Sequence, residues 1–314
     1  MCTAIHLCYE GLFGRTYDYE KSFGEEVVFT PREFMKMGES KNSYAMLGVG
    51  VVKGESTLYF DGMNEWGLAG AALNFPDYAA YHRASDKKAE IPSGLVLSFV
   101  LGFCKSVGEI KALFENVGIG DESVCGLPTS PLHWIFADSL GACTVESTED
   151  GLKVMYNPYG VLTNSPDFCY HKTRIADYVS LHSGYPENKL TKEPIYYYSR
   201  GMGAVGLPGD YSSSSRFIRA LFVKENSIDD GTKQGNINRM RHILSSVSIP
   251  RGCVVTKEYE PVSTLYTCIM DMENLTYYTC SYDNQSLRGI RLYQEKNERE
   301  LFNLYEKTHL ALIN

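Results

Sequence analysis

The sequence opens with Met1-Cys2-Thr3-Ala4-Ile5-His6-Leu7, in which a thiol stands directly behind the initiator methionine and a strand-like run follows. Removal of Met1 would leave Cys2 with both a thiol and a free α-amine, which ordinarily titrate near roughly 8.5 and 7.7 to 8.0. The amine can then take the thiol proton, so that nucleophile and base share one residue. Position alone also allows an incidental cysteine.

The next run, Phe13-Gly14-Arg15-Thr16-Tyr17-Asp18, follows a Glu10-Gly11 turn and is expected to run back beside the N-terminus as the second strand of a hairpin. There Arg15 could stabilise a thiolate and Asp18 could hold a charged α-amine. In an extended segment Arg15 and Tyr17 share one face and Asp18 takes the other, unless a bulge re-aims it. An isolated Arg-x-x-Asp would otherwise be a surface ion pair.

Strand-like runs rich in β-branched and aromatic residues occupy both ends of the chain. The turns Asn64-Glu65-Trp66-Gly67 and Glu149-Asp150-Gly151 predict hairpins. The expected strands are residues 3–7, 26–30, 44–52, 58–60, 68–75, 133–137, 143–146, 152–156, 263–271, 275–282 and 287–293.

Helical patterns lie between these strand blocks, at residues 173–181, 213–223, 237–246 and 93–116. The last of these is expected to be two helices, because Ser106 and Glu109 have the spacing of a capping box. Helices grouped between hairpin-linked strands favour antiparallel sheets layered with helices over a parallel α/β fold. We expect residues 1–314 to form one domain, in which the irregular stretch 183–209 is a functional loop that governs selectivity.

Composition excludes several classes of protein. A net charge of −8 without a basic stripe argues against nucleic acid as a partner. The longest apolar run, residues 95–104, is about half of the roughly 20 residues that a membrane span needs, so it predicts a buried helix. The first residues lack a secretory signal, which predicts a cytoplasmic protein.

Nine cysteines without a Cys-x-x-Cys pair do not suggest a disulfide framework or a zinc site. Most of these cysteines, Cys8 included, are expected to be small buried hydrophobic residues.

The chain resembles the choloylglycine hydrolase family, which comprises bile salt hydrolases and penicillin V acylases. The likeness runs from residue 1 past residue 282, and the joint order of its motifs is what makes it specific. Those motifs are Met1-Cys2-Thr3-Ala4, Phe13-Gly14-Arg15 with Asp18, Asp61-Gly62-Met63-Asn64-Glu65, Leu73-Asn74-Phe75, Pro131-Leu132-His133-Trp134, Gly160-Val161-Leu162-Thr163-Asn164-Ser165-Pro166, Gly206-Leu207-Pro208-Gly209-Asp210 and Ser215-Arg216-Phe217.

The resemblance implies roles for these residues. Cys2 would be the nucleophile, supported by Arg15 and Asp18. Asn74 and Asn164 match positions associated with the oxyanion site, where amide N–H groups can donate to a tetrahedral intermediate. The resemblance also implies an active-site arginine, Arg216, and an apolar cleft that Tyr17, Phe60 and Leu127 are candidates to line. From the residues alone, the two asparagines would belong to turns, Arg216 to a solvated helix face and the lining residues to the core.

The resemblance further implies an α+β fold of the N-terminal-nucleophile hydrolase type, an αββα sandwich of two antiparallel sheets between helical layers, assembled as a homotetramer. The implied reaction is hydrolysis of glycine- or taurine-conjugated bile salts through an acyl thioester on Cys2. No metal or organic cofactor is expected, because the polypeptide supplies base, nucleophile and oxyanion donors.

Four alternatives stay open. A penicillin V acylase would share the chemistry, although such acylases often resemble this pattern with tyrosine at position 74, where this chain has asparagine. A glutamine amidohydrolase would use the same thiol, but no synthetase domain is attached. A binding protein would keep the polar residues with Met1 retained. A papain-like enzyme would use His133 or His242 as its base, yet no nucleophile signature surrounds the other cysteines.

Overall fold

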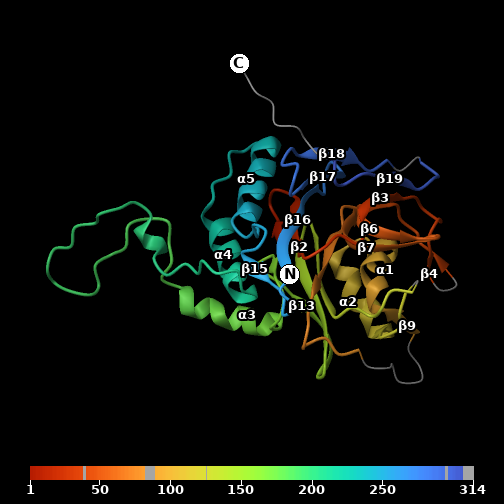
Figure 1. Cartoon of the computed structure of the whole chain (residues 1–314), viewed down its shortest axis with the longest axis horizontal. Helices are drawn as coiled ribbons and strands as arrows, with labels where there is room; N and C mark the ends of the chain where they lie inside the picture. Colours follow the sequence, from red (N-terminus) through yellow and green to blue (C-terminus); the bar gives the residue numbers. More distant parts are fainter. Residues whose placement is uncertain (38–39, 82–88, 125, 294–295, 307–314) are drawn as a thin grey trace, which may run out of the picture.

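Two antiparallel sheets lie face to face between layers of helices in the computed structural model (Figure 1). The structure describes residues 1–37, 40–81, 89–124, 126–293 and 296–306. The expected αββα sandwich is therefore confirmed, and it places the N-terminal strand in the middle of the molecule rather than at an edge.

The first sheet has the strand order β14-β1-β2-β16-β17-β18, with β15 paired to β16, and all of its pairings are antiparallel. It joins the two ends of the chain, because β2 pairs with β1 on one side and with β16 on the other. Its strands are β1 (Cys2–Leu7), β2 (Leu12–Tyr19), β14 (Val161–Leu162), β15 (Val254–Val255), β16 (Pro261–Asp271), β17 (Thr276–Ser281) and β18 (Arg288–Arg291).

The second sheet has the order β13-β12-β11-β8-β7-β6-β3-β19 and is also antiparallel. Both predicted hairpins are present, and Gly67 in the first turn has φ +77°, with the Met272 carbonyl 2.6 Å from where a Cβ would stand. Its strands are β3 (Glu26–Thr30), β6 (Met46–Lys53), β7 (Ser56–Asn64), β8 (Ala69–Asn74), β11 (Leu132–Asp138), β12 (Gly141–Thr148), β13 (Gly151–Tyr156) and β19 (Glu300–Phe302).

Helices cover the outer face of each sheet. Two helices, α1 (Val96–Phe103) and α2 (Val107–Asn116), pack on the second sheet. Two others, α4 (Ser213–Asn226) and α5 (Lys233–Ser245), pack on the first. The apolar run at residues 95–104 is thus a buried helix, as predicted, and no helix among the described residues is long and apolar enough to cross a membrane.

The predicted capping box of Ser106 and Glu109 is not formed, although α2 does begin directly after Ser106. The Ser106 hydroxyl caps nothing, because the Asp138 carboxylate already accepts from the Val107 N–H at 2.7 Å. The Glu109 carboxylate accepts instead from the Lys105 N–H, also at 2.7 Å. A neighbouring strand has therefore replaced the local cap.

Other boundaries differ from prediction. Helix α3 (Phe168–Arg174) begins five residues before the expected start at 173, because the Asp167 side chain accepts from the Tyr170 N–H, and it continues as the 3₁₀ turn η2 (Ile175–Tyr178). Several of the described strands were not predicted. Among them, β9 (Ala89–Pro92) runs parallel to β10 (Val117–Gly120), β4 (Lys36–Met37) pairs with β5 (Ser40–Lys41), β14 pairs with β1, β15 with β16, and β19 with β3. A 3₁₀ turn, η1 (Ser93–Leu95), precedes α1.

The predicted loop at 183–209 is irregular apart from the short turn η3 (Met202–Ala204). Figure 1 shows it as an arm that projects away from the sandwich on the α3 and α4 side. Large apolar side chains on this arm are exposed, among them Leu190, Tyr196, Tyr198 and Val205. The arm therefore contributes little to the core.

Most described cysteines are buried, as expected: Cys2, Cys104, Cys143, Cys268 and Cys280. Cys8 is an exception, because β1 ends at Leu7 and leaves Cys8 in the following turn, where it is half-buried. Cys169 and Cys253 are exposed, and Cys125 lies outside the described residues.

Candidate active site

Cys2 begins β1 and directs its side chain into the space between the sheets, where the residue is only 3% exposed. The hairpin pairs Cys2 with Tyr17 and Ala4 with Arg15, so the Cys2 and Arg15 side chains lie diagonally on the same face. The Arg15 Nη2 donates to Cys2 Sγ at 2.6 Å. Sequence alternation and the hairpin are thus enough to bring this cation to the thiol.

Arg15 is fully buried, and groups of the second sheet bind its guanidinium. Its Nη1 donates to the carbonyls of Phe60 at 2.7 Å and Ala72 at 3.0 Å, and lies 3.6 Å from the Asp61 carboxylate. Burial works to lower the pKa of Arg15, but the charges of Cys2, Tyr266 and Asp61 outweigh it and raise that pKa. Arg15 therefore stays a cation beside the thiol.

Asp18 lies on the other face of β2 from Arg15, as strand alternation predicts, although the pairing with β16 shifts register here, between Thr264 and Tyr266. Its carboxylate accepts from Thr264 Oγ1 at 2.6 Å and from Thr16 Oγ1 at 3.1 Å. Met1 is attached in this structure, and its ammonium group donates to the Asp18 carbonyl at 2.5 Å. The chain terminus therefore contacts the backbone of Asp18, whereas the Asp18 carboxylate bonds to the two threonine hydroxyls.

Arg216 and Asn164 flank the backbone of Cys2. Arg216, fully buried on α4, donates through Nη1 to the Cys2 carbonyl and to Thr3 Oγ1, both at 2.6 Å, and through Nη2 to Asn164 Oδ1, also at 2.6 Å. Asn164 Oδ1 also accepts from the Cys2 nitrogen at 2.8 Å. Burial lowers the pKa of Arg216, while the charges of Asp18 and Cys2 act against that fall.

Asn74 ends β8 at the cavity that Cys2 also lines. Its carbonyl accepts from Asn164 Nδ2 at 2.7 Å, and its side chain borders the cavity that contains Cys2. The two donors that converge on Asn164 Oδ1 fix the orientation of that amide. One N–H of Asn164 Nδ2 is used by Asn74, which leaves the second for a ligand.

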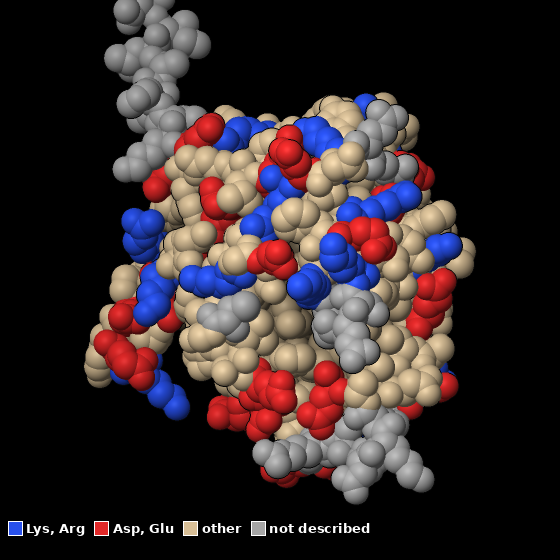
Figure 2. Space-filling model, turned by 90° about the vertical axis from the view of Figure 1, so that its right-hand side faces the viewer, with Lys and Arg blue, Asp and Glu red and all other residues tan. Residues whose placement is uncertain are grey.

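A cavity of about 300 Å³ opens above Cys2 and is lined mostly by apolar side chains. Tyr17, Phe60 and Leu127 all line it, and the rings of Tyr17 and Phe60 stack with centroids 5.2 Å apart. Two charged residues, Lys53 and Glu122, also border it. Figure 2 shows basic and acidic side chains interspersed on the face of the molecule that carries α1 and α2.

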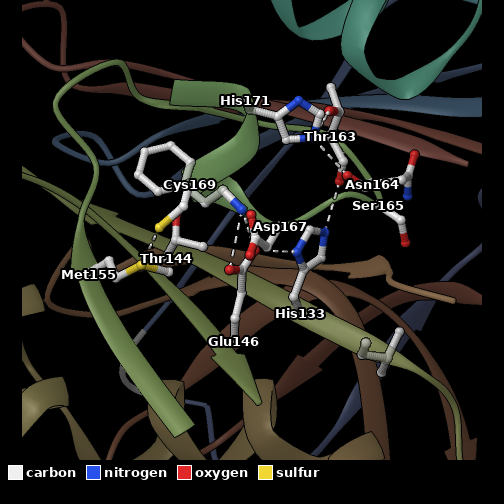
Figure 3. Close-up of polar contacts among 12 residues, drawn as sticks. His133, Thr144, Glu146, Met155, Thr163, Asn164, Ser165, Asp167, Cys169 and His171 are labelled. Atoms are coloured by element: carbon white, nitrogen blue, oxygen red, sulfur yellow. Dashed lines mark hydrogen bonds and ion pairs between the residues drawn. The ribbon is translucent and has the colours of Figure 1, made fainter. Parts of the chain in front are cut away.

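Behind the site, a buried network holds the loop that carries Asn164 (Figure 3). His133 Nε2 donates to the Thr163 carbonyl at 2.9 Å, and His133 Nδ1 lies 3.0 Å from the Glu146 carboxylate. His171 donates to the Asn164 carbonyl at 2.9 Å, and Ser213 Oγ donates to the same carbonyl at 2.8 Å. Burial lowers the pKa of His171 to about 4, so this ring is neutral at pH 7.

The papain-like alternative receives no geometric support. Both ring nitrogens of His133 are engaged by Glu146 and Thr163, and the ring stacks on Phe75 with centroids 4.2 Å apart. His242 lies in the last turn of α5, in the helical layer outside the first sheet.

Sequence reasoning missed several residues that build this site: Thr3, Ser213 and His171, which bond to Arg216 or to the Asn164 loop, and Tyr266, which packs on Tyr17. Thr3 stands inside the motif already quoted for Cys2. The others have no local signal: His171 reaches the Asn164 carbonyl only because α3 folds back on it, and Ser213 and Tyr266 come from elements distant in sequence from their partners. Among the described residues, no group of three or more His, Cys, Asp or Glu side chains could hold a metal ion.

Comparisons with known proteins agree with this geometry. Residues 2–303 match the model of the linear amide C–N hydrolases, choloylglycine hydrolase family. A bile salt hydrolase/transferase of Lactiplantibacillus plantarum is 40% identical over 304 residues, 94% of this chain and 93% of that protein. A bile salt hydrolase/transferase of Clostridium perfringens is 35% identical over 326 residues, 100% and 99% of the two chains.

Solved structures show the same fold. A mutant of conjugated bile acid hydrolase from Clostridium perfringens superposes with a TM-score of 0.90 at 34% identity and covers all of both chains. Penicillin V acylase from Agrobacterium tumefaciens gives a TM-score of 0.76 at 20% identity, over 96% of this chain and 91% of that one, which is a likeness of fold alone.

Proposed function

Because the chain belongs to the choloylglycine hydrolase family of linear amide C–N hydrolases, we propose that it cleaves the amide bond of glycine- or taurine-conjugated bile salts. One observation carries the proposal: Cys2 Sγ lies 2.6 Å from the buried guanidinium of Arg15, at the base of an apolar cavity. Relatives named bile salt hydrolase over nearly their whole length support the choice of substrate.

Activation requires the loss of Met1. The Cys2 nitrogen, now a peptide amide, would become an amine with Asn164 Oδ1 already in place as its acceptor at 2.8 Å. Departure of Met1 also frees the Asp18 carbonyl that its ammonium group now occupies. The proposed role of the Asp18 carboxylate is to stabilise the positive charge of the new α-amine. Opposite charges in a buried site favour the charged form of each other.

In the acylation step, the Cys2 thiolate attacks the amide carbonyl carbon and a C–S bond forms. The oxygen takes up the negative charge and accepts from the free N–H of Asn164 Nδ2 and from the Asn74 amide group. The protonated α-amine of Cys2 donates its proton to the leaving nitrogen, the C–N bond breaks, and glycine or taurine departs as an amine.

In the deacylation step, the neutral α-amine takes a proton from water while the hydroxide attacks the thioester carbonyl. The C–S bond breaks, the bile acid is released and the thiolate returns to Arg15. Every proton that moves is held by Cys2 or water, so Arg15, Asn164 and Arg216 act by charge and position alone.

The steroid fits the chemistry of the cavity. Aromatic and leucine side chains such as Tyr17, Phe60 and Leu127 offer apolar surface, and about 300 Å³ is within the range of small-molecule sites. The same lining disfavours glutamine, whose polar side chain would lose its hydrogen bonds to water there.

The nearest alternative substrate is penicillin V. Initial rates of glycocholate, taurocholate and penicillin V hydrolysis by one preparation separate the two functions. The proposal predicts that both bile salts turn over faster at equal concentration, and a preference for penicillin V would contradict it.

A second activity is favoured by the names of the two relatives above, each a hydrolase/transferase. The Cys2 acyl thioester could be resolved by an amine in place of water, which forms a new amide and conserves the acyl group. Added hydroxylamine should then trap bile acyl hydroxamate at the expense of free bile acid, and a product ratio that does not change with hydroxylamine would exclude the transfer.

We further propose that residues 1–314 act as a single domain, because β1 and β2 from one end of the chain share a sheet with β16 to β18 from the other. We place the enzyme in the cytoplasm, in keeping with the free thiols of the described cysteines.

We also propose a homotetramer, in which the 183–209 arm packs on other subunits. Exposed Tyr196 and Tyr198 support this role, because large apolar side chains on a projecting arm gain stability only when a partner covers them. Light scattering should give the mass of a tetramer, and a Y196S/Y198S variant should give smaller species. If the variant stays tetrameric but changes glycine against taurine preference, the arm sets selectivity instead.

A further inference from the structure

Asp61, in the run Asp61-Gly62-Met63-Asn64-Glu65, has no role in the proposed mechanism. The other polar members of this run serve the fold. Asn64 donates to the carbonyls of Leu101 and Cys104, and Glu65 pairs with Arg32. Asp61 instead points from β7 toward the first sheet and is fully buried.

The donors that reach Asp61 come from the opposite sheet. Tyr266 donates its hydroxyl to Oδ2 at 2.6 Å, Tyr277 donates its hydroxyl to Oδ1 at 2.5 Å, and Cys268 Sγ lies 3.5 Å from Oδ1. Arg15 Nη1 lies 3.6 Å from Oδ2. These partners occupy both carboxylate oxygens, as a buried carboxylate requires to remain ionised.

Arg15 also needs a counter-charge, because its guanidinium is fully buried. The carbonyls of Phe60 and Ala72 orient the group but carry no net charge. The Asp61 carboxylate lies 3.6 Å from Nη1 of the guanidinium, and Cys2 Sγ lies 2.6 Å from Nη2. When Cys2 ionises, two anions therefore share one cation.

We propose that Asp61 is a positioning residue for the reaction: with Tyr266 and Tyr277 it anchors Arg15 against Cys2 Sγ, and it takes part of the guanidinium charge so that the thiolate remains reactive. A thiolate that faced the full charge of Arg15 would form more readily but attack more slowly, because nucleophilicity falls with basicity. This inference rests on the proposed role of Cys2 as nucleophile.

Groups from every surrounding element bear on this charge balance. Burial raises the pKa of Tyr266, Tyr277 and Cys268 well above their ordinary values, so these groups remain neutral donors. Burial also raises the pKa of Asp61, but Arg15 and those three donors act against that rise. Other described groups that bear on the Cys2–Arg15 pair are Tyr17 and Tyr19 of β2 and Arg216 of α4, on which the charge of Asp18 also acts. After loss of Met1, the α-amine of Cys2 adds a further titrating group.

The test compares the pH dependence of Cys2 alkylation in full-length protein whose loss of Met1 has been verified by intact mass. Iodoacetamide is the probe, and peptide mapping restricts the readout to Cys2. Asp61→Asn removes the charge and keeps the shape. Asp271→Asn is the matched control. Asp271 is a buried carboxylate of β16 that pairs with Lys233 and accepts from the backbone N–H groups of Glu273 and Asn274.

For D61N we expect the pH of half-maximal alkylation to fall by about one pH unit, because the Coulomb repulsion between the Asp61 carboxylate and the thiolate is removed. The limiting rate at high pH should fall about threefold. The two profiles should therefore cross, whereas D271N should follow the wild type. A merely structural role for Asp61 would change stability without such a crossing.

A folded D61N protein with the wild-type profile would overturn the inference. If D61N does not fold, Tyr277→Phe is the second test, because loss of that hydroxyl makes Asp61 easier to protonate. A smaller fall in the pH of half-maximal alkylation supports the inference, and an unchanged pH overturns it. The alkylation assay needs no bile salt. Absence of glycine release from the wild type would therefore count against the proposed function, but it would not affect the comparison of the alkylation profiles.

Discussion

Replacement of Asn164 by alanine tests the centre of the site most sharply, because this one side chain serves three partners. It accepts from the Cys2 nitrogen at 2.8 Å and from Arg216 at 2.6 Å, and it donates to the Asn74 carbonyl at 2.7 Å. The proposed mechanism adds a fourth partner, the oxyanion, which exists only in the transition state.

The expected magnitudes follow from these partners. Loss of an oxyanion donor lowers kcat by about 10² to 10³, or roughly 2.7 to 4 kcal/mol. The KM for glycocholate should change little, because the lost interaction is absent in the ground state. Stability should also fall by about 1 to 3 kcal/mol, because a buried N–H of Arg216 and that of Cys2 lose their acceptor.

The assay is steady-state hydrolysis of glycocholate, with urea unfolding of the same proteins. Asn42→Ala is the matched control: Asn42 is also buried and bonds to four backbone groups, but it lies between β5 and β6 and does not line the cavity that contains Cys2. It should lose similar stability and keep its kcat. If folded Asn164→Ala retained kcat within about threefold of the wild type, the assigned role of Asn164 in catalysis would be refuted.

Three further outcomes are expected. His133→Leu removes the ring that holds the Thr163 carbonyl, so kcat should fall at least about tenfold in a folded protein; an unchanged kcat would show that the Asn164 loop holds itself. Burial lowers the pKa of His171 to about 4, from 6.5 in the unfolded chain, so the unfolded chain binds more protons between these values and the free energy of unfolding falls as pH falls. Urea unfolding at pH 7 and pH 5 should show that His171→Gln removes about 2 kcal/mol of this loss. An equal loss in both proteins would contradict the assignment. Phe60→Ala should lower kcat/KM for glycocholate about 10- to 100-fold, mainly through KM, because the side chain lines the cavity; an unchanged KM would place the steroid elsewhere.

The N-terminal half of the site could be predicted from sequence because its geometry is local. A tight hairpin fixes which residues of β1 and β2 lie side by side, and strand alternation fixes which of them share a face. The positions of Arg15 and Asp18 on opposite faces of β2 follow from that rule alone. The turn at Gly67 was predictable for the same reason, since only local backbone conformation is involved.

The rest of the site depends on long-range pairing that no local pattern records. Asn164 and Arg216 meet at Cys2 from positions 162 and 214 residues away, and the sequence alone predicted a turn and a solvated helix face for them. The resemblance to a family pointed to both residues, but not to their shared bond. The capping box failed for a related reason: a carboxylate from a distant strand, Asp138, replaced the local partner.

The most direct test of the account is the intact mass of the purified chain, followed on the same sample by release of glycine and taurine from conjugated bile salts, with Cys2→Ala alongside. We predict that Met1 is absent, that amino acid is released, and that the variant releases none. Equal release by Cys2→Ala, or full activity from a chain that still carries Met1, would contradict the claim that the N-terminal Cys2 is both nucleophile and base.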